Sequence, residues 1–254
     1  CYLESPALVP VQGRGLYFIV AVGKIKIMER KLEFSVGEYY HIYSRGVDKR
    51  DIFLGQDDYT RFMKLLFLCN GTEPIVFRLI QNQPLDEIKR GTKLASVGAY
   101  CLMPNHFHLL ARETVEGGIT KYLGKLLTSY SMYFNKKNER VGTLFSSRFH
   151  AAHADSDEYL RYLFSYIHLY PVKLIKPDWR ERGLLDIDRP LILKHLFAYP
   201  YSSYQDYVGD NQNSRGQILN REDFPEYFQS AHDFSDFIND WLAYSDPIQG
   251  RGLY

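Results

Sequence analysis

The most constraining feature of the sequence is a long amphipathic stretch that follows Gly117 and Gly118. Its apolar and aromatic residues recur three and four positions apart: Ile119, Tyr122, Leu123, Leu126, Leu127, Tyr130, Tyr133 and Phe134. This spacing places them on one face of an α-helix, where we expect the tyrosines to pack in the core. A helix with one wide apolar face must cover a sheet or another helix, so the stretch predicts a packed domain.

Strand and helix patterns alternate on both sides of this helix. Aromatic and β-branched residues between turn residues predict strands, and apolar residues at helical spacing predict helices. The predicted order is strand 38–45, helix 57–69, strand 94–102, strand 106–112, the long helix, strand 145–152, and a helix between Ser156 and Pro171. The connection at 70–93 is predicted to be rich in loops, with a short strand at 75–80. The fold class is therefore α+β, and a ferredoxin-like βαββαβ antiparallel sheet with an extra helix is the simplest architecture.

Charge is distributed unevenly along the chain. Residues 1–200 carry 28 basic and 21 acidic side chains, whereas residues 201–254 carry 3 and 9. We predict three parts: an N-terminal extension at 1–27 that precedes Met28 and is interpreted as upstream reading frame, an α+β domain at 28–175, and an acidic extension with loops and a helix at 176–254. The basic part suggests a polyanionic partner.

Three features argue against membrane and disulfide-based classes. The apolar run at 16–22 is too short to span a bilayer, and it lacks the small-residue cleavage pattern of a secretory signal. Cys1, Cys69 and Cys101 are far apart and form no CxxC motif, so we expect neither a disulfide framework nor a thiolate zinc site. A reducing, cytoplasmic setting without membrane insertion is expected.

A pair of histidines is the central candidate for chemistry. On the strand predicted at 106–112, His106 and His108 point to one face and Phe107 to the other. Two imidazoles on one face suit a divalent metal ion and leave positions open for water and substrate oxygen. Histidine pairs in hairpins are also often surface or hydrogen-bonded residues, so the spacing alone leaves both interpretations open.

Tyr166 differs from most of the 21 tyrosines in the chain. On its predicted helix it flanks the apolar stripe at about 90° from the centre, where the hydroxyl can face a groove while the ring stays anchored. A phenol can attack phosphorus when a metal ion polarises the phosphate. Tyr166 is therefore the candidate nucleophile.

Four segments carry a family resemblance. They are CLMPNHFHLL (101–110), SYSMYFNKKNERVGTLFSSRFH (129–150), DSDEYLRYLFSYIHLYPVK (155–173) and YPYSSYQDYVG (199–209). Together they resemble the single-tyrosine HUH transposases, and in particular the REP-associated tyrosine transposase branch. The resemblance covers roughly residues 37–209. It implies a ferredoxin-like catalytic domain that cuts and rejoins single-stranded DNA next to a hairpin, as a monomer or a homodimer.

The resemblance also implies roles for individual residues. His106 and His108 match the family's metal-binding pair for Mg²⁺ or Mn²⁺, and Tyr166 matches its nucleophile, which forms a 5′-phosphotyrosine and releases a free 3′-OH. The family usually has Asn or Gln four residues after the nucleophile, where this chain has Tyr170, a doubtful third ligand that would bring a phenol to the metal or pack away from it. His41, on a neighbouring strand, is expected to support the ligands rather than to bind the metal.

Basic residues supply the expected contacts to DNA phosphates, with tyrosines stacking on unpaired bases. The candidates are Arg45, Lys121, Lys125, Lys136, Lys137, Arg140 and Arg148. For any one of them a purely solvated surface position is an equally good interpretation.

Two other functional classes remain as alternatives. The first is a non-catalytic relative that binds hairpin DNA or RNA, for which Tyr170 argues. The second is another nuclease or esterase. The sequence contains no GxxxxGK[ST] pattern, no GxSxG pattern and no second histidine motif, which disfavours helicase-linked initiators, serine hydrolases and two-histidine phosphoesterases.

Overall fold

The computed structural model describes residues 33–74, 76–80, 82–182, 184, 188–209 and 217–243, together with the backbone of two short strands near the N-terminus. These strands, β1 (Leu8–Gly13) and β2 (Leu16–Ala21), pair antiparallel with each other. The rest of the extension predicted at 1–27 lies outside the described residues. No helix in the described ranges combines the length and the apolar character needed to cross a membrane.

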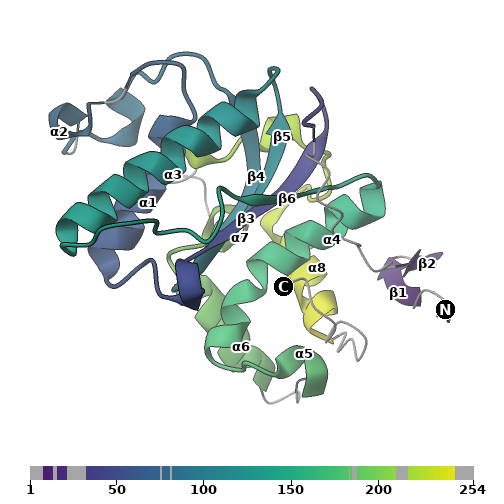
Figure 1. Cartoon of the computed structure of the whole chain (residues 1–254). Coiled ribbons are helices and arrows are strands. Elements are labelled where there is room, and N and C mark those ends of the chain that lie inside the picture. The colour runs from purple at the N-terminus through teal and green to yellow at the C-terminus, as the bar shows by residue number, and fades with distance from the viewer. Residues whose placement is uncertain are drawn as a thin grey trace, which may run out of the picture.

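A four-stranded antiparallel sheet forms the centre of the molecule (Figure 1). Its strands are β3 (Tyr39–Arg45), β4 (Ala95–Met103), β5 (His106–Glu113) and β6 (His150–His153), in the spatial order β4-β5-β3-β6. Helices α1 (Gln56–Cys69) and α3 (Gly118–Lys137) each connect two strands that have one strand between them. The predicted α+β class and the βαββαβ order of a ferredoxin-like sheet are thus confirmed.

The helices form one layer on each face of the sheet (Figure 1). On the first face, α1 and α3 pack over Phe107, whose ring lies 5.2 Å from that of Phe62. The core tyrosines of α3 anchor this layer, because the hydroxyls of Tyr122 and Tyr130 donate to the backbone carbonyls of Leu66 and Ile52. On the second face lies α4 (Asp157–His168), which packs against β4 and β5.

A buried carboxylate connects β5 to α3. Glu113, the last residue of β5, accepts hydrogen bonds from the backbone N–H groups of Gly118 (3.0 Å) and Ile119 (2.7 Å) at the start of α3. These N–H groups have no partner within the helix, and the negative charge suits the positive end of the helix dipole. A side chain is excluded at Gly118, since a Cβ there would lie 2.0 Å from the carbonyl oxygen of Leu94. The long helix is therefore held directly against the histidine strand.

Two local expectations were wrong. Where a short strand was predicted at 75–80, the chain forms the short helix α2 (Phe77–Ile80). The guanidinium of Arg61 lies 3.4 Å from the centre of the Phe77 ring, and Lys64 donates to the carbonyl of Ile80 (2.6 Å), so contacts from α1 hold this turn. Strand β6 is shorter than the predicted 145–152 because the segment before it makes only one isolated bridge, between Gly46 and Phe145.

Short helices make up most of the remaining structure. They are η1 (Val47–Lys49), η2 (Leu85–Glu87), η3 (Tyr170–Leu174), α5 (Trp179–Arg182), α6 (Arg189–Ala198), α7 (Tyr204–Val208), η6 (Arg221–Asp223) and α8 (Ala231–Ala243). The helix α8 lies in the extension in which one helix was predicted, and its residues Phe234 and Ile238 are buried in the core.

The C-terminal segments cover the outer edge of the sheet. The backbone of β4 pairs with them at three points: Leu102 N–H to Tyr201 O, Ser203 N–H to Tyr100 O, and Asn220 N–H to Val97 O, at 2.8–3.0 Å. Unpaired edge strands are open to pairing with other chains, and this cover removes that hazard. The described residues around 201–203 and 220 are therefore packed onto the edge of the sheet.

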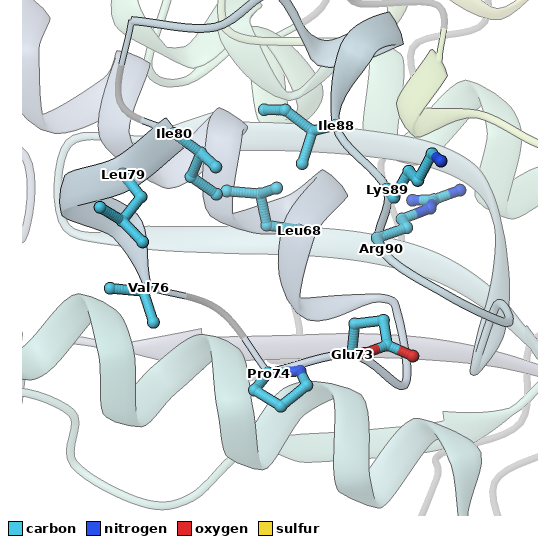
Figure 2. A pocket seen from close by; sticks show the side chains of 9 residues that line it. All are labelled: Leu68, Glu73, Pro74, Val76, Leu79, Ile80, Ile88, Lys89 and Arg90. Atoms are coloured by element: carbon cyan, nitrogen blue, oxygen red, sulfur yellow. The ribbon is translucent and has the colours of Figure 1, made fainter.

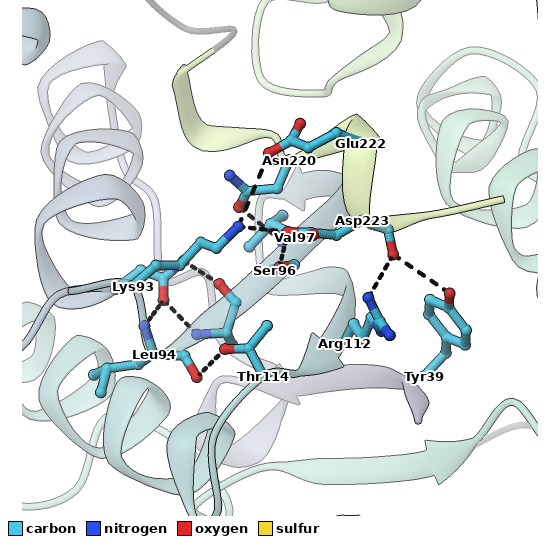
Figure 3. Close-up of polar contacts among 12 residues, drawn as sticks. Tyr39, Lys93, Leu94, Ser96, Val97, Arg112, Thr114, Asn220, Glu222 and Asp223 are labelled. Carbon is cyan, nitrogen blue, oxygen red and sulfur yellow. Dashed lines mark hydrogen bonds and ion pairs between the residues drawn. The ribbon is translucent and has the colours of Figure 1, made fainter. Parts of the chain in front are cut away.

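Asp223 is the main polar anchor of this cover (Figure 3). Its carboxylate accepts from Lys93 Nζ and Ser96 Oγ, both at 2.5 Å, and its backbone carbonyl accepts from Tyr39 and Arg112 at 3.3 Å. Burial raises the pKa of Asp223, but the bonds from Lys93 and Ser96 outweigh burial and hold the pKa below its ordinary value of 3.8. The charged form is thus favoured in the folded protein.

We expect Asp223→Ala to lower the free energy of unfolding by about 1–3 kcal/mol, because it leaves Lys93 and Ser96 without their acceptor. The contribution of Asp223 is present above the ordinary carboxyl pKa and is lost as the pH falls through the lowered pKa of the folded state. Urea unfolding measures the change. The matched control is Glu222→Ala, since Glu222 lies 3.9 Å from Lys93 and is 71% exposed. Equal stability of the two variants would contradict the anchor.

Candidate active site

His106 and His108 lie together on the face of β5 that α4 covers. Their side chains are 8% and 3% exposed, and their ring centres are 5.0 Å apart with the planes nearly perpendicular. Phe107 points to the other face, as the alternation along a strand requires. The expected placement of the two rings on one face is therefore observed.

One nitrogen of each ring has a partner, and the other has none among the described residues. Nδ1 of His106 lies 2.6 Å from Oδ1 of Asn105, and Nδ1 of His108 lies 2.9 Å from Nε2 of His41. Among the described residues, no hydrogen-bond partner lies near Nε2 of either His106 or His108, although both atoms are buried. Buried nitrogen atoms without a partner are costly, and a bound metal ion would satisfy both.

Asn105 determines which nitrogen of His106 carries the proton. Its amide nitrogen donates to the carbonyl of Lys49 (3.1 Å), so its amide oxygen is turned toward the ring of His106. Nδ1 of His106 must then donate, and Nε2 keeps its lone pair. Outer partners of this kind commonly fix the orientation of metal-ligating histidines.

His41 contacts His108 from the neighbouring strand β3. A lone pair on Nε2 of His108 requires that Nδ1 carries the proton and donates it to Nε2 of His41. Asn105 lies in the turn between β4 and β5, and it is not singled out by the sequence analysis. Its place immediately before His106 could have indicated that its amide orients the His106 ring, because the turn brings the amide beside that ring.

Two tyrosines close over the histidine pair. The ring of Tyr166, on the last turns of α4, lies 5.6 Å from that of His108 and 5.5 Å from that of His41. The ring of Tyr170, at the start of η3, lies 4.2 Å from that of His108 and 5.1 Å from that of His106. Tyr170 therefore packs on the histidines and does not point away from them.

The orientation of α4 is held from both ends. Ser156 caps its N-terminus, accepting from the backbone N–H of Tyr159 (3.2 Å). Near the C-terminus, Nδ1 of buried His168 lies 2.7 Å from the carbonyl of Phe164, and its Nε2 lies 2.7 Å from Oγ of Ser203. Because residues two apart on a helix point to nearly opposite sides, tying His168 to the C-terminal cover directs Tyr166 toward the histidines.

Burial keeps the histidines of the site neutral. It lowers the pKa of His41 and of His106 to about 3, and for His106 the charges of Arg45 and Lys173 add to the effect. The pKa of His108 is well below 6.5, chiefly through burial and then through its histidine neighbours, Lys173 and Arg180. No cluster of three or more His, Cys, Asp or Glu side chains able to hold a metal occurs in the described residues. Neutral imidazoles among cationic side chains suit an anionic ligand.

Two of these cations were not singled out by sequence reasoning. Nζ of Lys173 lies 5.0 Å from the centre of the Tyr170 ring, and the guanidinium of Arg180 lies 4.6 Å from the centre of the Tyr166 ring. Lys173 is the last residue of the segment 155–173 that carries the resemblance, so its place in the sequence could have identified it as a site residue. Arg180 lies beyond the predicted domain boundary, and only the turn between η3 and α5 brings it back.

The predicted phosphate-binding residues are dispersed. Arg45 lies beside the histidine pair, where its charge lowers the pKa of His106. Lys125 instead donates to the backbone carbonyls of Gly71 and Glu73, and Lys137 pairs with buried Asp58 at 2.7 Å, so both serve the fold. Lys121, Lys136 and Arg140 lie along or just after α3 on the opposite layer, and Arg148 is exposed before β6.

A cavity of about 180 Å³ lies away from this site, between the end of α1 and the 73–90 connection (Figure 2). It is lined by Leu68, Glu73, Pro74, Val76, Leu79, Ile80, Ile88, Lys89 and Arg90. It shares no residue with the histidine pair and its neighbours.

One family model matches part of the chain. Residues 82–169 match the sequence model of the IS200-like transposases. This match identifies the segment as transposase-like. It confirms the resemblance predicted from the sequence, and the matched segment contains His106, His108 and Tyr166.

A solved structure of a REP-associated tyrosine transposase bound to a REP hairpin matches with 13% identity and a TM-score of 0.42, over 74% of this chain and 94% of that one. No match was found among curated proteins.

The lowered pKa values predict that His106 and His108 do not titrate between about pH 5 and 8. Their ring resonances in two-dimensional NMR spectra of the metal-free protein should stay unchanged over that range. The unfolded chain takes up these protons near pH 6.5 and the folded chain does not, so stability should fall as the pH drops below that value. A midpoint near 6.5 for either ring in the folded protein would contradict its burial as a neutral group.

Proposed function

We propose that the chain is a metal-dependent single-stranded DNA endonuclease and strand transferase that acts next to DNA hairpins in transposition. The observation that carries the proposal is that the Nε2 atoms of His106 and His108 share one buried site with the ring of Tyr166 and have no hydrogen-bond partner in the described part of the chain. The match of residues 82–169 to the IS200-like transposases supports it.

The donor set fits a divalent ion. Two neutral imidazoles, each fixed on its Nδ1 side, would hold Mg²⁺ or Mn²⁺ through Nε2 of His106 and His108, and nitrogen ligands favour Mn²⁺. When bound, the ion supplies polarisation of the scissile phosphate and neutralises charge on its oxygens. Tyr170 would be a poor third ligand, because a phenol with an ordinary pKa of about 10 is protonated at neutral pH.

Tyr166 performs the covalent step. Its phenol oxygen attacks the scissile phosphorus in line, so that a phosphotyrosine bond forms to the 5′ side of the DNA while the bond from phosphorus to the 3′ oxygen breaks. The phenol loses one proton and the leaving 3′ oxygen gains one, so no net proton is taken up or released. The ester conserves the energy of the phosphodiester, so attack by another 3′-OH reverses the step and rejoins the strand without a nucleotide cofactor.

The proposed substrate is single-stranded DNA that carries a hairpin. Arg45 and Lys173 supply positive charge beside the histidines, and Arg148, Lys121, Lys136 and Arg140 remain candidates for contacts farther along the DNA. Because one chain brings Tyr166 and both histidines together, a monomer suffices to form the site, and a homodimer stays a second possibility. The division into a catalytic part at 28–175 and an extension at 176–254, and the cytoplasmic setting, stay predictions from the sequence.

A second candidate function is non-catalytic binding of hairpin DNA or RNA. Tyr170 favours it, since its buried ring packs 4.2 Å from that of His108, at the position where the family that the sequence resembles usually has Asn or Gln. In this case the basic groups would bind nucleic acid while Tyr166 never forms a covalent bond to it.

Tyr166→Phe should abolish the covalent protein–DNA adduct and leave DNA binding intact, because it removes only the hydroxyl. Mass spectrometry of the protein after incubation with Mn²⁺ and a hairpin oligonucleotide from the DNA flanking its gene measures the adduct. The matched control is Tyr162→Phe, one turn earlier on the same helix, with its ring 5.4 Å from that of Trp241. An adduct on the Tyr166→Phe protein would show that another residue attacks, and no adduct on the unmodified protein would favour the binding function.

The position of Tyr170 predicts a weak site for Mg²⁺. Mn²⁺ should therefore support more cleavage than Mg²⁺, and Tyr170→Asn should increase Mg²⁺ affinity and Mg²⁺-dependent cleavage by supplying an amide oxygen. Calorimetric titration with each ion measures affinity separately from activity. Tyr170→Phe is the control, because it keeps the ring that packs on His108 and removes only the hydroxyl. If Tyr170→Asn leaves Mg²⁺ affinity unchanged or lower, residue 170 does not limit the metal site.

A further inference from the structure

We propose that Arg180 binds the phosphodiester that Tyr166 attacks and holds it against the phenol. Arg180 would thus be a phosphate-positioning residue that the sequence motifs do not identify. The inference rests on the proposed function, since it assigns Arg180 to the same phosphate.

The position of Arg180 depends on stacking between rings. Its guanidinium lies 4.6 Å from the centre of the Tyr166 ring and 5.2 Å from that of its neighbour Trp179, which is itself buried. A planar guanidinium stacks well on aromatic faces, and this contact is worth about 0.5–2 kcal/mol. Stacking fixes the plane of the group and leaves its N–H donors along the edge, where they can bind two phosphate oxygens at once.

The charge of Arg180 is not used elsewhere in the described part of the chain. No hydrogen bond or ion pair to another described residue occupies its guanidinium, although the side chain is half-buried. By contrast Arg182, two residues later on α5, pairs with Asp178 at 2.8 Å and is 81% exposed. The two arginines of one short helix therefore have different surroundings, and only Arg180 faces the candidate site.

A second cation lies near the other tyrosine of the site. Nζ of Lys173 lies 5.0 Å from the centre of the Tyr170 ring, which packs on His108, while Arg180 lies over the ring of Tyr166. The nucleophile and the metal-binding pair thus lie between two cations, and a phosphodiester placed there would meet Arg180 at the Tyr166 end.

The test measures binding to DNA in the presence of EDTA, so that no cleavage occurs. The probe is a synthetic DNA hairpin with single-stranded flanks taken from the DNA beside the gene. A second set of probes carries one neutral methylphosphonate in place of one phosphate, moved along the flank. Fluorescence anisotropy gives the affinity of the unmodified protein, Arg180→Gln, Arg180→Lys and the matched control Arg182→Gln for each probe.

Arg180→Gln should lower affinity about tenfold and reduce the log–log salt slope by about 0.7, the loss of one phosphate contact on single strands. The affinity of the Arg180→Gln protein should also be unchanged by the methylphosphonate at one position, whereas the affinity of the unmodified protein should fall there. This position should be the phosphate that forms the Tyr166 adduct when Mn²⁺ is supplied. Arg180→Lys should keep the salt slope but lower the adduct yield, since an ammonium lacks the planar pair of donors. Arg182→Gln should behave as the unmodified protein.

The outcomes separate this proposal from the function on which it rests. If Arg180→Gln matches Arg182→Gln in affinity and in its response to every methylphosphonate, Arg180 does not bind a phosphate. If coupling to one phosphate is found but no Tyr166 adduct forms, the phosphate contact stands and the strand-cleavage function falls. If the protein does not bind the hairpin probe at all, both are wrong.

Discussion

Two buried imidazole nitrogens that find no partner in the described ranges of the chain are the constraint around which the rest of the site is arranged. The pleat of β5 places His106 and His108 on one face, and burial keeps both rings neutral. Asn105 and His41 bind the Nδ1 atoms, so that the lone pairs at Nε2 remain available. A neutral, oriented and buried pair of nitrogen donors is costly to maintain unless something binds there, which is why the pair carries the functional argument.

The C-terminal extension belongs to the support of this site. It pairs with the open edge of β4, and through Ser203 it holds His168, which sets the rotation of α4 and hence the direction of Tyr166. Asp223 secures the same cover from the other end of the strand. An acidic segment that follows a basic domain suggests a separate function. In the structure, however, its described residues support the edge of the sheet and the orientation of α4.

Much of this arrangement follows from sequence periodicity alone. The strand and helix periods give the βαββαβ order, and the alternation along one strand places the histidine pair, because both depend on residues close in sequence. The roles of Asn105 and Arg180 depend on turns that bring them to the rings, and no local pattern reveals these. The same limit applied to Lys125 and Lys137, whose backbone and carboxylate partners come from distant segments, and to the 75–80 segment, which contacts with α1 hold as a helix.

The most direct test of the central claim is an anomalous-difference map from crystals of the protein grown with Mn²⁺. The account predicts a single strong peak in contact with Nε2 of both His106 and His108, with Nδ1 of each ring still bound to Asn105 or His41. A peak elsewhere with no density between the two rings, or a ring turned so that its Nε2 faces another protein group, would contradict it.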